Sequence, residues 1–538
     1  MFKQDFLAGL TVAIVALPLS MALAIASGAS PDKGLITAVI AGFLLSFVGG
    51  SRVQIGGPTG AFVVVVFGVI AQHGYDGLLL ATLLAGVMLI AAGYSRLGSM
   101  IKYIPHPVIT GFTTGIALII ATSQVKDFLG LTPTHTPSDF IEKWQSYFAA
   151  IATANPWAVG VGLGALALIL GLRRYAPKWP SYLIAIILFS GFVAVWGWPV
   201  ETVGLKFGIL PSGLPLPSWP EVSFSKVQAV LPSAFTIAFL AGVEALLSAV
   251  VADSMTGHRH RPNQELIGQG VANVASAFWG GLPATGALAR TATNIRAGAQ
   301  SPMAGVFHSI FILAFLLFGM QLIAFVPMAV LAAILFVVAW GMSEVHQFIR
   351  IFKLSWTGRV ILVLTFLLTV LVDLTVAIAV GVTLASLLFM HEMSKAVEFG
   401  AQTKKQCKTP EDQETDADQR DDLPEGVEVF RIAGPLFFGV ATDLLETFKA
   451  MGQMPRVLIV RMRLVPYLDP TAEAVLEGLA KDCQQANTQL IFSGLQPQPM
   501  AILQRAGIKS GKNGVLFAPD FQSALGEALA KASEQQET

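Results

Sequence analysis

The chain has 538 residues, of which 54% are hydrophobic and only 13% are charged, a balance far too apolar for a soluble protein of this length. Basic and acidic residues are equal in number, so no overall charge attracts nucleic acid or an acidic partner. The composition predicts a polytopic protein embedded in the lipid bilayer. Any recognition of an anion must then come from the local placement of charges and dipoles.

Apolar runs recur from Phe6 to about Val397, and there are about fourteen of them, each of roughly 15 to 25 residues. The first run, residues 6–27, is long enough to span a membrane and is followed at once by others, so we expect no cleaved signal peptide. Lysine and arginine concentrate in alternate loops. By the positive-inside rule this places both termini in the cytoplasm.

The tripeptide Thr-Gly-Ala occurs twice in apolar surroundings, at residues 59–61 and 285–287. Each copy follows a glycine pair and a proline, a pattern that interrupts one membrane helix and opens another. The copies lie 226 positions apart, which predicts two repeats of about seven spans, residues 6–198 and 231–398. Because the number of spans per repeat is odd, the second repeat is inverted. The two half-helices, segments 3 and 10, then meet near the middle of the membrane.

The composition changes at the end of this transport domain, residues 1–398. Residues 399–425 are polar and charged, as is typical of a flexible linker, and residues 426–532 alternate strand and helix patterns. This alternation predicts a small cytoplasmic α/β domain. The expected strands are residues 427–432, 457–462 and 489–493, and the expected helices are residues 441–451, 470–486 and 499–506.

The starts of the two half-helices predict an anion-binding site. The first amides of a helix have no internal acceptor, and the helix dipole places roughly half a positive charge there. Gly60 and Gly286 let a ligand approach the backbone, while the hydroxyls of Thr59 and Thr285 can cap a helix or donate to an anion. For one copy alone, simple capping of a kinked helix is an equal alternative, and the duplication favours the site.

Arg290 lies one turn beyond Gly286, on the same face of the second half-helix and inside an apolar run. A charged side chain at this depth marks a pathway or an ion pair. We therefore expect Arg290 to hold the anion. The alternative is a fixed salt bridge with Glu244.

Glu244 lies in the middle of the apolar run 231–253, with Ser248 one turn away on the same face. A carboxyl group buried near an arginine can be tuned to bind and release a proton during turnover, so Glu244 is the expected proton carrier. Ala287 and Leu288 supply no hydroxyl ligand for sodium. This favours proton coupling over sodium coupling.

Motifs of catalysis and of metal binding do not occur in a context that supports them. Cys407 and Cys483 lack CxxC or metal-ligand spacing. No serine–histidine–aspartate, HExxH, Walker or Rossmann pattern occupies a credible position. The sequence therefore predicts neither an enzyme nor a metal or cofactor site.

Four stretches carry a resemblance to a known family: residues 16–24 (ALPLSMALA), 56–62 (GGPTGAF), 248–253 (SAVVAD) and 289–296 (ARTATNIR). On these stretches the chain resembles the SulP family, also called solute carrier family 26. The resemblance implies an anion transporter of 14 transmembrane segments in a seven-plus-seven inverted repeat. It also implies a C-terminal STAS domain, a homodimer and a place in the bacterial inner membrane.

Residues 124–131 and 263–270 are similar to the C4-dicarboxylate carriers of the family. This similarity implies proton-coupled uptake of succinate, fumarate or aspartate. The resemblance also places the anion between segments 3 and 10, with the first helix lining the cavity. The substrate contacts expected from the residues and the resemblance together are Ser20, Thr59, Gly60, Ala61, Thr285, Gly286, Ala287, Leu288, Ala289 and Arg290.

Several alternatives stay open. Sulfate and bicarbonate are further candidate substrates, because a site made of dipoles and an arginine recognises charge more than shape. An uncoupled anion channel and a nucleobase permease of the same architecture are rival transport functions, although the permease explains neither Arg290 nor the soluble domain. From another class, a membrane-tethered regulatory scaffold would leave the paired half-helices without a purpose.

Overall fold

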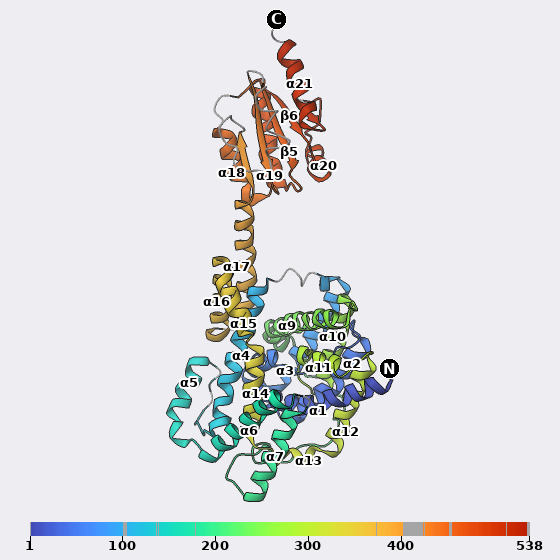
Figure 1. Cartoon of the computed structure of the whole chain (residues 1–538), viewed down its shortest axis with the longest axis vertical. Helices are drawn as coiled ribbons and strands as arrows, with labels where there is room; N and C mark the ends of the chain where they lie inside the picture. Colours follow the sequence, from blue (N-terminus) through green and yellow to red (C-terminus); the bar gives the residue numbers. More distant parts are fainter. Residues whose placement is uncertain are drawn as a thin grey trace. The chain divides into compact units, whose positions relative to one another are not determined.

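The computed structural model describes residues 2–99, 105–135, 137, 139–177, 179–372, 374–401, 423, 426–450, 454–512 and 514–534. The chain divides into two compact units, Met1–Ala385 and Ser386–Thr538. The first is helical, and the second holds a five-stranded sheet (Figure 1). Cys407 and most of the expected linker, residues 402–422 and 424–425, lie outside the described residues.

Eight helices of the described chain build the first half of the helical unit. They are α1 (Phe2–Ala26), α2 (Pro31–Val48), α3 (Val63–Tyr94), α4 (His106–Leu129), α5 (Phe140–Ala149), α6 (Pro156–Tyr175), α7 (Ser181–Trp196) and α8 (Val203–Phe207). Within α3, Gly74 has φ 70° and ψ −178°, a conformation that glycine adopts without strain. Gly74 divides α3 into a short first helix, which follows the first Thr-Gly-Ala, and a longer second one.

The second half has a matching short helix. Its elements are α9 (Phe224–Thr256), α10 (Pro262–Phe278), α11 (Leu288–Arg296), α12 (Met303–Phe318), α13 (Met320–Ile323), α14 (Met328–Met342), α15 (Val345–Leu354), α16 (Trp356–Leu371) and α17 (Leu374–Lys395). Helix α11, after the second Thr-Gly-Ala, has only 9 residues. In the described part of the chain, 8 helices are long and apolar enough to cross a membrane, and three apolar helices are shorter. The count of fourteen spans therefore stays a prediction.

A short antiparallel pair of strands joins the two halves. Strand β1 (Gly56–Gly57) leads through the 3-10 turn η1 (Gly60–Phe62) into α3, and β2 (Thr285–Gly286) leads into α11. Gly56 lies opposite Gly286, and Gly57 lies opposite Thr285. Because the strands run antiparallel, the two short helices leave the pair in opposite directions. This is the geometry expected of an inverted repeat.

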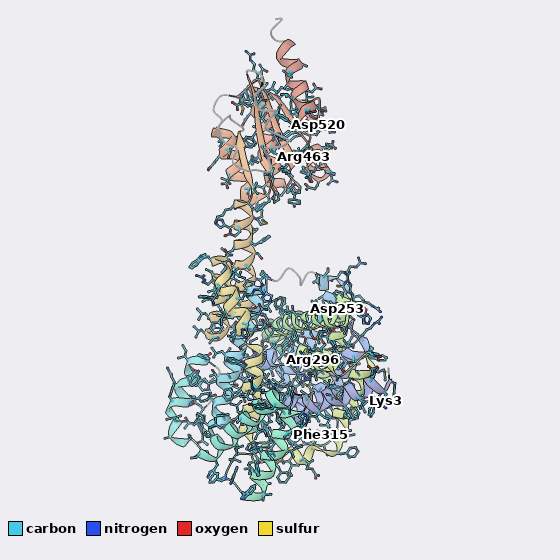
Figure 2. The ribbon with its side chains drawn as sticks, in the orientation of Figure 1. Lys3, Asp253, Arg296, Phe315, Arg463 and Asp520 are labelled. Atoms are coloured by element: carbon cyan, nitrogen blue, oxygen red, sulfur yellow. The ribbon has the colours of Figure 1, made fainter. Side chains whose placement is uncertain are left out.

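The helices pack in two groups, with side chains filling the spaces between the ribbons (Figure 2). One group contains α1, α2, α3, α9, α10, α11 and α12, and the other contains α4, α6, α7, α14 and α16. Small residues let helices approach closely where lipid gives no hydrophobic drive for association. A Cβ on Gly86 of α3 would lie only 2.7 Å from the carbonyl oxygen of Gly270 in α10, so these two backbones are nearly in contact.

The second unit is an α/β domain with strand order β3-β4-β5-β6-β7. The strands are β3 (Glu398–Ala401), β4 (Val427–Ala433), β5 (Val457–Leu464), β6 (Gln489–Ser493) and β7 (Val515–Ala518), and only β3 pairs antiparallel in the described sheet. Alternate residues of β5 face opposite sides. Leu458 and Val460 join a core with α18 (Phe438–Ala450), α19 (Pro470–Gln485) and α20 (Pro497–Arg505), whereas Val457 and Ile459 pack with α21 (Phe521–Glu534).

The three expected strands and three expected helices of this domain are present, with ends that differ by a few residues. Strands β3 and β7 and helix α21 were not predicted. Residues 399–401, which the sequence analysis placed in the flexible linker, belong to β3. This edge strand is held by backbone pairing with β4, so its short sequence carries little apolar pattern.

Candidate functional site

Thr59 connects the first half-helix to α9. Its hydroxyl donates a hydrogen bond of 2.8 Å to the Oε2 atom of Glu244. The structure thus brings the expected proton carrier to the start of the first half-helix. In this conformation the Thr59 hydroxyl donates its one hydrogen bond to Glu244, so it cannot also donate to an anion.

Arg290 is buried, with 1% of its surface exposed. Its Nη2 donates to the Ser20 hydroxyl at 3.1 Å and to the carbonyl oxygen of Pro58 at 3.0 Å. Among the described residues, Nε and Nη1 have no hydrogen-bond partner, and no ion pair joins Arg290 to Glu244. The alternative of a fixed salt bridge is therefore not what the structure shows. Two buried donors without a partner make Arg290 a candidate for binding an anion.

The start of the first half-helix offers free amides. The first hydrogen bond of η1 runs from the amide of Phe62 to the carbonyl oxygen of Thr59 at 3.3 Å. The amides of Gly60 and Ala61 precede that bond and have no acceptor within the helix. Gly60 and Ala61 are both buried, so these dipoles act in a medium that screens them weakly.

The start of α11 is arranged in the same way. Thr291 donates the first helical bond to Ala287 at 2.9 Å, so the amides of Leu288, Ala289 and Arg290 come before it. Leu288 and Ala289 are exposed in this conformation, whereas Ala287 is buried. The amide of Ala287 is already used, because it donates to the carbonyl oxygen of Ile55 at 2.8 Å.

Thr285 and Ser248 hold α11 in place. The Thr285 hydroxyl donates to the carbonyl oxygen of Ala241 at 2.9 Å and accepts from Nε2 of Gln269 at 2.8 Å. The Ser248 hydroxyl donates to that of Thr291 at 3.3 Å. The hydroxyl protons of both predicted residues are thus committed within the protein, and Ser248 makes its described contact with Thr291 instead of with Glu244.

Packing inside the protein explains the glycines of the site. A Cβ on Gly57 would lie 2.2 Å from Nη1 of Arg290, and one on Gly286 would lie 1.4 Å from Nε2 of Gln54. A Cβ on Gly60 would lie 2.4 Å from Sδ of Met342. Gly286 and Gly60 were expected to admit a ligand to the backbone. In this conformation they admit other side chains of the chain itself.

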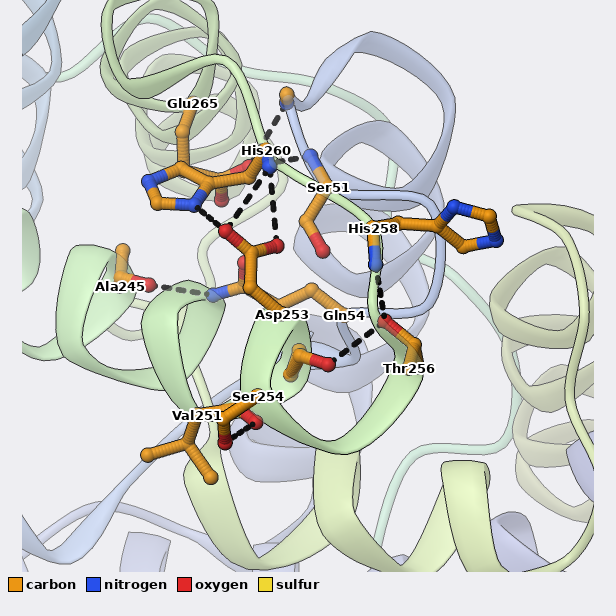
Figure 3. Close-up of polar contacts among 12 residues, drawn as sticks. Ser51, Gln54, Ala245, Val251, Asp253, Ser254, Thr256, His258, His260 and Glu265 are labelled. Atoms are coloured by element: carbon orange, nitrogen blue, oxygen red, sulfur yellow. Dashed lines mark hydrogen bonds and ion pairs between the residues drawn. The ribbon is translucent and has the colours of Figure 1, made fainter.

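Buried side chains that the sequence analysis missed brace these loops. Gln54 donates to the carbonyl oxygen of Ala245 at 3.0 Å (Figure 3). Oε2 of Glu265 accepts from the amides of Gly50 at 2.8 Å and Ser51 at 3.0 Å. Glu265 stands in the first turn of helix α10, and an acidic residue there is the signal that could have revealed this contact.

Asp5, near the N-terminus, braces another loop of the site. Its Oδ1 accepts from the amide of Gln300 at 2.7 Å, and its Oδ2 accepts from the Ser301 hydroxyl at 2.6 Å. The loop before α12 is therefore fixed to α1. Asp5 and Glu265 thus hold the loops that adjoin the two half-helices.

Comparison with known proteins places this site in a family. Residues 2–365 match the model of the Sulfate permease family, and residues 420–523 match that of the STAS domain. The chain belongs to the sulfate permease, or SulP, family. It is 42% identical to the putative sulfate transporter YvdB of Bacillus subtilis over 95% of both chains. It is 32% identical to the bicarbonate transporter BicA of Picosynechococcus, over 94% of this chain and 90% of BicA.

Solved structures agree with this assignment. The transmembrane domain of a cyanobacterial bicarbonate transporter BicA matches with a TM-score of 0.64 and 31% identity, covering 70% of this chain and 97% of that domain. SLC26A9 matches with a TM-score of 0.86 over 100% of this chain and 91% of its own, at 18% identity. The second match shows the fold alone.

The SulP assignment confirms several predictions. The chain is a multi-pass membrane protein with the helical transporter fold and a C-terminal STAS domain, and it is an anion transporter and not an enzyme. YvdB and BicA are named for sulfate and bicarbonate, so they give no support to the expected C4-dicarboxylate substrate. Proton coupling and the homodimer also stay predictions.

Proposed function

We propose that this SulP protein is a secondary active transporter that carries sulfate across the membrane together with a proton on Glu244. The observation that supports this most is the buried guanidinium of Arg290, whose Nε and Nη1 have no partner among the described residues. It stands beside the starts of two half-helices that β1 and β2 hold together. The guanidinium and the two helix starts thus place positive charge around one site.

The charges of these groups favour a divalent anion. Arg290 contributes one positive charge, and each helix start contributes roughly half a charge, which gives a total of about +2. Ionised Glu244 subtracts one charge from that total. A divalent anion is therefore balanced only when Glu244 carries a proton, and the binding of the anion and of the proton favour each other.

Thr59 links the protonation of Glu244 to the binding of the anion. While Glu244 is ionised, the Thr59 hydroxyl donates to its Oε2. Protonation of Glu244 removes that charged acceptor. The Thr59 hydroxyl is then free to donate a hydrogen bond to the anion. The anion gains one donor at the moment when the charge balance also improves.

Sulfate fits this arrangement better than the other candidates. Bicarbonate has a single charge and is balanced only while Glu244 is ionised, so its binding would not favour uptake of a proton. A C4-dicarboxylate separates its two charges along a carbon chain, whereas the positive groups here converge on one place. The relative with 42% identity is named as a putative sulfate transporter, which supports the same choice.

The proposal includes a location and an assembly for the protein. We place the protein in the inner membrane with both termini in the cytoplasm, because the basic residues concentrate in the loops on that side. The transport domain is residues 1–398 and the STAS domain residues 426–532. We retain a homodimer as the expected assembly.

Uptake of labelled sulfate into proteoliposomes tests the function. We expect an imposed proton gradient, acidic on the side of entry, to drive accumulation above equilibrium, with excess succinate and bicarbonate competing weakly. Currents without accumulation would instead indicate a channel. If succinate accumulates and sulfate neither enters nor competes, the dicarboxylate prediction is correct and sulfate is wrong.

A further inference from the structure

A cavity of about 220 Å³ runs along the first half-helix. On that helix it begins at Val63, close to the free amides of Gly60 and Ala61, and continues to Gln72. It reaches the end of α1 at Ala26 and the end of α16 at Val372. These helix ends lie on the side of the membrane that the sequence predicts to be external.

The cavity separates the two groups of helices. On one side its wall comes from α1, α3 and α9 of the first group, and on the other from α4 and α16 of the second group together with α5. A transporter that moves one bundle past another opens and closes its route along such a boundary. The position therefore fits the outer part of a route that ends at Arg290.

Lys143 of α5 is buried in the wall of this cavity, with 6% of its surface exposed. Its Nζ lies 5.1 Å from the centre of the Phe67 ring, on the opposite wall. Among the residues that the structure describes, Nζ makes no hydrogen bond and no ion pair. Burial lowers the pKa of Lys143, and the nearby acid Asp139 opposes this effect only in part.

An ammonium group in this position lacks a strong partner. The face of a phenylalanine ring attracts a cation more weakly than a hydrogen-bonded anion does. Gln72 also lines the cavity and can donate hydrogen bonds, whereas the Ser123 hydroxyl already donates to the carbonyl oxygen of Ile120 at 2.7 Å. The lining is therefore able to hold a small anion that enters from outside.

We propose that Lys143 and Gln72 form an outer binding site that holds the transported anion before it reaches Arg290. This inference rests on the proposed function, because it concerns the same substrate. When no anion is present, Phe67 covers the ammonium group of Lys143. An arriving anion takes the place of the ring and brings its charge next to the first half-helix.

The chain offers a matched control. Lys226 is also predicted to be external, but 44% of its side chain is exposed and its Nζ lies 2.5 Å from Oε2 of Glu221. Removing its charge leaves the cavity unchanged. A general effect of external positive charge would appear in both lysine variants, whereas an effect of the outer site would appear only at Lys143.

The test is the sulfate concentration dependence of uptake into right-side-out membrane vesicles. We expect Lys143→Met to raise the external KM about tenfold, because the anion loses its attraction to one partly screened positive charge. The kcat and the KM for internal sulfate should stay unchanged. Lys143→Arg should restore most of the affinity, and Lys226→Met should behave like the wild type. An unchanged external KM in Lys143→Met, with active wild type, overturns the outer site alone. An inactive wild type rejects the proposed function instead.

Accessibility gives a second readout that does not need full activity. In Gln72→Cys, a membrane-impermeant maleimide added outside should label position 72, and external sulfate should slow the labelling. With Lys143→Met added, sulfate should no longer protect. Equal protection in the two variants would show that Lys143 does not bind the anion, and no protection in either would remove the site altogether.

Discussion

At the scale of single residues, Arg290 and Glu244 are both charged groups within the helical unit, yet the structure gives them different partners. Arg290 contacts Ser20 and the backbone of Pro58, with donors left over, whereas Glu244 accepts from Thr59. The first arrangement is suited to holding an anion. The second is suited to a group whose charge changes during transport.

Arg290→Gln removes the charge and two charge-assisted donors. We expect sulfate uptake to fall at least about 100-fold, because each such hydrogen bond contributes roughly 1.5–3 kcal/mol. Arg290→Lys keeps the charge but loses the planar fork of donors, and it should restore uptake only in part. Size-exclusion profiles in detergent provide the control for folding. Wild-type affinity in a folded Arg290→Gln protein would remove Arg290 from the site.

Glu244→Gln tests proton coupling. The amide cannot change its charge, so sulfate exchange between equal concentrations should persist while acceleration by a proton gradient disappears. Uptake and exchange measured in the same proteoliposomes separate the two properties. If uptake by Glu244→Gln still follows the proton gradient, the proton is carried elsewhere.

Cys483 provides a pH prediction in the STAS domain. Burial raises the pKa of its thiol to about 11, so at pH 8 the reactive thiolate is only about one part in a thousand. In a Cys407→Ser variant, we expect a thiol reagent to react very slowly at pH 8, faster as the pH approaches 11, and at once after unfolding. Rapid labelling of the native protein at pH 8 would contradict the buried position.

At the scale of elements, the pair of strands β1 and β2 requires glycine at position 57. Gly57→Ala places a methyl group 2.2 Å from Nη1 of Arg290 and must displace the guanidinium. We expect a loss of sulfate affinity similar to that of Arg290→Gln. Gly171→Ala in α6 is the control, since a Cβ there meets nothing within 4 Å and the residue lies away from the site. Equal uptake by the two alanine variants would show that Arg290 can move without harm.

The elements that could be predicted are those with a pattern in the sequence. The two Thr-Gly-Ala copies predicted two short helices that start near each other, because glycine pairs and a proline interrupt an apolar run. The strand pair itself was not predicted, since two residues are too short to show the alternation of a strand. Its register depends on backbone bonds between distant segments.

The partners of the polar side chains were harder to foresee. Arg290 was expected to contact either the anion or Glu244, but its donors go to Ser20 and Pro58 from other elements. Thr285 was expected to face the anion and instead bonds to Ala241 and Gln269. Sequence places a residue on a face of its own helix. It does not show which of several packed helices that face meets.

At the scale of the whole molecule, every residue of the candidate site lies within Met1–Ala385. We expect a chain that ends at Lys395, where α17 ends, to accumulate sulfate at a rate of the same order as the full chain. Uptake per folded molecule in proteoliposomes is the measurement. Complete loss of uptake by a well-folded truncated chain would show that the STAS domain is required for transport.

The strand pair also bears on how such a molecule could have arisen. In the part of the chain that the structure describes, Gly56–Gly57 pairs with Thr285–Gly286 of the other repeat, which runs in the opposite direction. A protein of half this length, made from one repeat, would complete the pair only with a second copy inserted upside down in the same bilayer. Duplication and fusion of the gene would make that dual insertion permanent, and each half could then change its sequence independently around a shared glycine-rich joint.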